Sequence, residues 1–225
     1  MRRLLLALLF VPLAAGAQTP ETLFNLVSLN AQAEREIPND LLTAMLTAEA
    51  EGADPAQLAD SVNRAMQRAL STALAYKTVK AQSAGYQTIP GYDKGRIARW
   101  RVRQELRLES ADFAATTELV GKLQASLMVT GLALSVSPEA RHKAENALIA
   151  EALAAFEERA RVVRDAMKAK GYRVRDLQVS PGGVSPRPML AMAARGASSE
   201  SLAQPALEPG TTRILVMVSG TIQLQ

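Results

Sequence analysis

The chain has 225 residues, of which 48% are hydrophobic and 21% are charged, and its formal net charge is +4. This length suits one large domain or two small ones that pack intimately, and the apolar fraction is sufficient for a core. The sequence contains no cysteine and one histidine. The lack of cysteine excludes a disulfide framework, a thiol nucleophile and a thiolate metal site.

The N-terminus shows the three parts of a secretory signal peptide in the expected order. Arg2 and Arg3 precede an apolar run at 4–13, and the small residues Ala-Gly-Ala follow at 15–17. The apolar run is too short to cross a bilayer core, which takes about 20 helical residues. A buried helix of the mature fold is the alternative, but it does not explain this order. We therefore expect residues 1–17 to be removed by cleavage after Ala17.

The mature chain would begin at Gln18. We expect it to be periplasmic, either free or associated with the outer membrane, with no transmembrane segment. No cysteine follows the cleavage site to carry a lipid anchor. The loss of two arginines lowers the formal net charge from +4 to +2, which weakens the argument for a polyanionic partner.

In the first part of the mature chain, alternating apolar residues predict strands at 23–33 and 40–51, joined through Pro38-Asn39 as an antiparallel hairpin. A helix is expected next, because Asp54 can cap it and Pro55 suits its first position. Residues 82–87 predict another strand, and "PGYDKG" at 90–95 predicts an exposed turn.

Arginines recur through the next segment, "RIARWRVRQELRLES" at 96–110. From residue 99 onward, two sets of side chains alternate. One parity contains the apolar residues Trp100, Val102, Leu106 and Leu108, and the other contains Arg99, Arg101, Arg103, Glu105, Arg107 and Glu109. A nucleic-acid surface would add stacking aromatics, but Trp100 lies on the apolar side. We therefore predict a half-buried strand whose charged face is solvated or paired across strands, and no nucleic-acid partner.

The second half begins with a helix that Ser110 or Asp112 can cap, followed by a strand at 127–136. Ser137 and Pro138 then start the longest helix, which ends before Gly171. Its apolar stripe either packs on a sheet, as neighbouring alanines favour, or joins a helix of another chain. The stripe contains Ile149, Leu153, Phe156, Ala160, Val163 and Met167.

The last part of the chain contains two strands separated by a long segment. Residues 172–179 predict one strand, and 211–225 predict a central strand because its second face is only weakly polar. Residues 180–210 are rich in Pro, Gly, Ser and Ala, so we expect a flexible loop that serves as a tether or as a docking arm. In total, seven strands and three helices describe an α+β protein with antiparallel or mixed sheets packed against its helices.

The sequence contains no recognisable catalytic or metal-binding pattern. His142 lies in "EARHKAEN", on the charged early turns of the long helix, where a surface position is expected. There is no histidine pair and no clustered aspartate pattern. We assign no catalytic, cofactor-binding or metal-binding residue and expect a non-enzyme without a cofactor. The alternative is an exported hydrolase, which would need at least two buried carboxylates in a pocket.

Several short features occur in an order that resembles one protein family. They are Pro38-Asn39-Asp40, "QSAGYQTIP" at 82–90, the strand at 100–108 before Phe113, the segment 132–136 before the alanine-rich helix, and Lys170-Gly171-Tyr172. This order resembles the SIMPL domain family, also called DUF541, over about residues 22–224. The chain departs from the family where "SLNAQA" at 28–33 replaces glycines of the first strand and where Trp100 replaces the usual tyrosine.

The resemblance implies a single SIMPL-like domain at 18–225, folded as two interlocked subdomains. It also implies export, ring-like oligomers in some members, and a role in envelope or oxidative-stress defence. The family includes periplasmic stress-related proteins and surface antigens of Gram-negative bacteria. It has no agreed catalytic residues that could be assigned to positions of this chain. The expected partners are therefore a second copy of the chain and a periplasmic or envelope protein.

Overall fold

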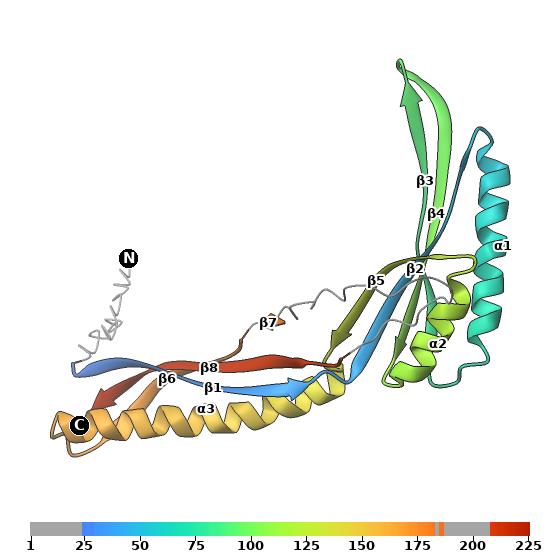
Figure 1. Ribbon diagram of the computed structural model, residues 1–225. Helices are drawn as coiled ribbons and strands as arrows, with labels where there is room; N and C mark the ends of the chain where they lie inside the picture. The colour runs from blue at the N-terminus through green and yellow to red at the C-terminus, as the bar shows by residue number, and fades with distance from the viewer. Residues whose placement is uncertain (1–23, 183–184, 187–207) are drawn as a thin grey trace, which may run out of the picture.

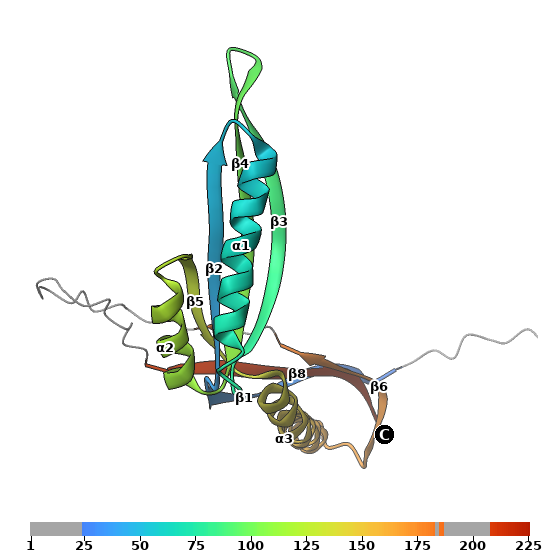
Figure 2. The ribbon, with the colours of Figure 1, turned by 90° about the vertical axis from the view of Figure 1, so that its right-hand side faces the viewer.

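The fold consists of two antiparallel sheets, each covered by helices on one face (Figure 1). The computed structural model describes residues 24–182, 185–186 and 208–225. One sheet has the order β1-β8-β6, with β7 also paired to β8, and the other has the order β3-β4-β2-β5. Helix α3 lies on the first sheet, and α1 and α2 lie on the second. The two layered units meet at a steep angle, which gives the molecule an L shape (Figures 1 and 2).

The described elements confirm the predicted α+β class. The first unit contains β1 (Leu26–Pro38), β6 (Tyr172–Pro181), β7 (Ser185–Pro186), β8 (Thr211–Leu224) and α3 (Pro138–Ala166). The second unit contains β2 (Leu41–Gly52), β3 (Lys80–Asp93), β4 (Arg96–Ser110), β5 (Met128–Ser135), α1 (Pro55–Ala73) and α2 (Phe113–Leu123). The predicted signal peptide at 1–17 and most of the predicted loop at 180–210 lie outside the described residues.

The predicted hairpin between the first two strands is wrong. β1 pairs with β8 along its whole length, whereas β2 pairs with β4 and β5 in the other sheet. At the junction, the N–H of Asn39 donates to Gly210 O (3.1 Å) and the N–H of Asp40 donates to Ser135 O (3.1 Å). These bonds tie the junction to distant segments instead of closing a turn, so the chain passes from one sheet directly into the other.

The side chains of Asn39 and Asp40 secure this junction. Asn39 Nδ2 donates to Pro209 O (2.7 Å), and its Oδ1 accepts from Thr212 Oγ1 (2.6 Å), which fixes the start of β8. Asp40 accepts from the N–H of Ser137 (2.5 Å) and from Ser137 Oγ (2.8 Å), which fixes the start of α3. Two consecutive residues therefore hold the two units together at the corner of the L.

The core of the first unit lies between α3 and the strands β1 and β8. The prediction that α3 packs on a sheet is confirmed, but its buried row differs from the predicted stripe. The row follows a spacing of four and contains Ala144, Leu148, Ala152, Phe156 and Ala160. Met167, at the end of the predicted stripe, is 65% exposed. The small alanines bring the helix close to the sheet, and β8 is central, as its sequence predicted.

The core of the second unit lies between its two helices and the strands β2 and β4. The caps largely follow the prediction, because Asp54 accepts hydrogen bonds at the start of α1 and Ser137 does so at the start of α3. For α2 the cap is Asp112, since Ser110 Oγ donates instead to Thr78 O (2.6 Å). Within the described ranges, no helix is both long enough and apolar enough to cross a membrane.

Candidate interaction surfaces

The arginine-rich strand β4 has one dry face and one charged face, as its parity predicted. Val102, Leu106 and Leu108 are fully buried against the helices. On the opposite face, β2 places Glu49 and Glu51 in register with Arg103 and Arg101. The strand prediction is confirmed, and of the two predicted alternatives for the charged face, pairing across strands is found at Arg99 and Arg101.

The glutamates of this charged face pair with its arginines one after another. Glu51 contacts Arg99 Nε at 2.6 Å and Arg101 Nη2 at 2.9 Å, and Glu49 contacts Arg101 Nε at 3.3 Å. Further along β4, Arg103 pairs with Glu105 and Arg107 pairs with Glu109. Most of the positive charge on this face is thus compensated locally.

The titration behaviour of Glu51 reflects this pairing. The pKa of the Glu51 carboxyl is held below its ordinary value, mainly by the hydrogen bond from Arg101. The charges of Arg99 and Arg101 act in the same direction. The same contact raises the pKa of Arg101. Both groups therefore remain ionised over a wider pH range than they would alone.

Strands β3 and β4 extend past the N-terminal end of α1 as a projecting hairpin (Figures 1 and 2). The turn is shorter than the six residues predicted, because β3 continues to Asp93 and only Lys94 and Gly95 connect the strands. Both connecting residues have positive φ, 45° for Lys94 and 80° for Gly95. Two positive φ values in a two-residue turn suit the right-handed twist of a hairpin, and glycine adopts such a φ without strain.

The projecting hairpin exposes large apolar side chains. Near its tip, Tyr92 is 67% exposed and stands opposite Ile97 on the other strand, and further down Tyr86 and Ile89 are also exposed. Exposed apolar groups that cluster on one element mark interaction surfaces. The sequence pattern did not predict this surface, because residues 90–95 were expected to form a turn. The sequence signal for this surface is the pair of Tyr92 and Ile97, which lie two residues before Lys94 and two residues after Gly95.

The residues considered for catalysis or metal binding are not brought together. The side chain of His142 is 75% exposed on α3, with Nδ1 3.6 Å from Glu145 Oε2. In the part of the chain that the structure describes, no Asp or Glu is buried. The same ranges contain no group of three or more side chains suited to a metal ion. The described residues therefore do not supply the buried carboxylate pair that the hydrolase alternative requires.

Comparison with protein-family models relates this architecture to other proteins. The model described as SIMPL, protein of unknown function (DUF541), matches residues 27–222. The chain belongs to the SIMPL family. The matched part of this SIMPL protein extends from β1 into β8, so it includes strands of both sheets and the Asn39-Asp40 junction. A search of the curated proteins found no match.

Proposed function

We propose that this SIMPL protein is exported to the periplasm and acts there without catalysis, in envelope or oxidative-stress defence. It works through contacts with further copies of itself or with an envelope protein. The charged, apolar and small-residue segments at 1–17 support export. The stress role follows from the family resemblance.

The observation that carries the proposal is the projecting β3–β4 hairpin. The cores of both units are covered by helices, but the β3–β4 hairpin extends beyond the N-terminal end of α1 (Figure 1), and Tyr92 and Ile97 near its turn are exposed to water. Tyrosine is enriched in protein interfaces, since it combines a large apolar ring with a polar tip. A partner that covered this pair would remove apolar surface from water without disturbing either core.

A complementation experiment tests this proposal. In a Gram-negative strain that lacks this protein, survival in hydrogen peroxide should fall, and the wild-type chain should restore it. The double variant Tyr92→Ser/Ile97→Ser should fail to restore survival, because it removes the apolar tip but no core residue. His142→Ala should restore survival fully, since the imidazole is an exposed surface group.

The matched control is Val162→Ser/Met167→Ser, which removes two exposed apolar side chains, one from the last turns of α3 and one from its C-cap. It should rescue as well as wild type. The intact mass of the protein in the periplasmic fraction should show a chain that begins at Gln18. Equal survival of the strain without the protein, or full rescue by the hairpin variant, would refute the proposal.

A further inference from the structure

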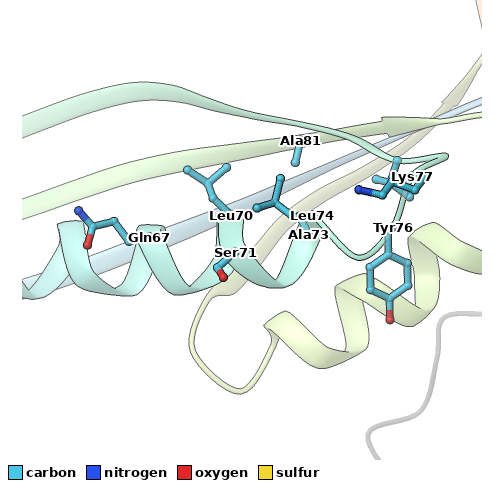
Figure 3. Close-up of a pocket in the computed structure, with 9 residues that line it drawn as sticks. Gln67, Leu70, Ser71, Ala73, Leu74, Tyr76, Lys77 and Ala81 are labelled. Carbon is cyan, nitrogen blue, oxygen red and sulfur yellow. The ribbon is translucent and has the colours of Figure 1, made fainter.

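A hollow of about 510 Å³ lies between the C-terminal end of α1 and the start of β3 (Figure 3). Its apolar lining comes from Leu70, Ala73, Leu74, Val79 and Ala81. Ala73 and Val79 are buried and form its floor, whereas Leu74 is 71% exposed at its rim. The volume falls within the range of small-molecule sites, about 300–1,000 Å³.

The hollow follows from the placement of α1 and from small residues on β3. α1 packs mainly on β2 and β4 and touches β3 only lightly. The residues of β3 that share the face of the core are small: Ala81 stands opposite Leu108, and Ser83 stands opposite Leu106. The space beside the helix is therefore left unfilled, while further along α1 Val62 and Met66 are buried in the core.

Three polar side chains of the lining have no partner in the described part of the chain, and one of them carries a positive charge. Lys77 is the only charged residue of the lining, which also includes Gln67 and Ser71. Among the described residues, no hydrogen bond or ion pair engages these three side chains. Tyr76 is already used, because its hydroxyl donates to Glu118 Oε1 (2.8 Å). In Figure 3 the Lys77 amino group points toward the side of the hollow that Leu74 lines.

We propose that this hollow binds a single-chain amphiphile with an anionic head, of the class of medium-length aliphatic carboxylates. The hydrocarbon chain lies against Leu70, Leu74 and Ala81, where each methylene removed from water favours binding. The carboxylate meets the ammonium of Lys77 in a charge-assisted hydrogen bond.

A peptide fits this hollow less well than a hydrocarbon chain does. The last carbonyls of α1, those of Leu70, Thr72 and Ala73, already accept hydrogen bonds from the N–H groups of residues 74–76. The end of α1 therefore offers these acceptors to no N–H group of a peptide, whose backbone would lose hydrogen bonds to water there without replacement.

Calorimetric titration of residues 18–225 with decanoate, below its micellar concentration, tests this site. We expect saturable one-to-one binding, and at least about tenfold weaker binding of decyltrimethylammonium, which has the same chain with the opposite charge. Lys77→Gln should weaken decanoate binding about three- to tenfold. Lys80→Gln is the control, since Lys80 stands opposite Glu109 on the other face of the sheet, and it should leave the affinity unchanged.

A second variant fills the hollow. Ala81→Phe should abolish decanoate binding because its ring occupies the space of the chain, whereas Ala133→Phe, on the exposed side of β5, should not. Equal binding of the anionic and cationic amphiphiles would overturn the proposal, as would wild-type affinity in both Lys77→Gln and Ala81→Phe. Non-saturable uptake, or binding only to anionic phospholipid vesicles, would also overturn it. None of these results depends on the hairpin or on the stress role.

Discussion

Asp40 shows how a single half-buried carboxylate sets the relation between two sheets. It lies directly before β2 in the sequence, yet its oxygens accept hydrogen bonds from the backbone N–H and the hydroxyl of Ser137 at the start of α3. Ser137 Oγ in turn accepts from the N–H of Ala140 (3.2 Å), so the cap of α3 and the corner between the sheets form one network. Removal of the carboxylate would leave the N–H of Ser137 without its acceptor.

We therefore predict that Asp40→Ala lowers the free energy of unfolding by about 1–3 kcal/mol, the usual cost of leaving a partly buried donor unsatisfied. Urea denaturation monitored by circular dichroism measures this change. Asp60→Ala is the control, because Asp60 makes only an exposed ion pair with Arg64 and should cost less than about 1 kcal/mol. An effect of Asp40→Ala no larger than that of Asp60→Ala would contradict the structural role of the junction.

Sequence parity predicted which side chains of β4 are buried, but not their partners. The orientation of Val102 or Arg101 follows from the two-residue period of a strand, which is a local property. Glu51, one of the two glutamates that pair with Arg101, lies 50 residues away on β2. Its identity depends on which strands become neighbours, and the alternation within one strand carries no information about that.

At the scale of elements, the long helix α3 was predicted correctly and its buried face only in part. Ser137 and Pro138 are strong start signals, so the helix itself was clear. Two candidate rows share Phe156 and Ala160, and the predicted one favoured larger residues over the alanines that the structure buries. Alanine is a weak hydrophobic signal, although it is the residue that allows a helix to approach a sheet closely.

This packing predicts the effect of enlarging a buried alanine. Ala152 is fully buried against the first sheet, so Ala152→Leu should lower the free energy of unfolding by about 1–3 kcal/mol through overpacking. Ala154→Leu, on the exposed side of the same helix, makes the same change in volume and helix propensity and should be nearly neutral. Thermal or urea unfolding of both variants gives the comparison, and an equal loss in the two would mean that α3 does not bury this row.

For the whole molecule, the sequence indicated the fold class but not the division into two sheets. Pro38-Asn39 looked like the turn of a hairpin, because short Pro and Asn segments between two strands usually are. The pairing of β1 with β8 instead joins opposite ends of the described chain, from Leu26 beside Gln223 to Pro38 beside Thr211. Such long-range pairing is decided by competition among all strands and leaves no mark in local periodicity.

The two units form the two arms of the L-shaped molecule, and the β3–β4 hairpin extends the arm formed by the second unit (Figure 2). The Tyr92–Ile97 pair near the end of that arm is the most exposed aromatic and β-branched cross-strand pair of the hairpin. Because it lies far from both cores, its burial requires another molecule. We propose that the protein acts by assembling through this hairpin.

The most direct test is the molar mass of residues 18–225 in solution, measured by light scattering behind a sizing column at several concentrations. We predict a discrete multimer that persists on dilution, that falls to a monomer in Tyr92→Ser/Ile97→Ser, and that is unchanged in Val162→Ser/Met167→Ser. A monomer at every concentration, or a multimer that the hairpin variant leaves intact, would contradict the claim.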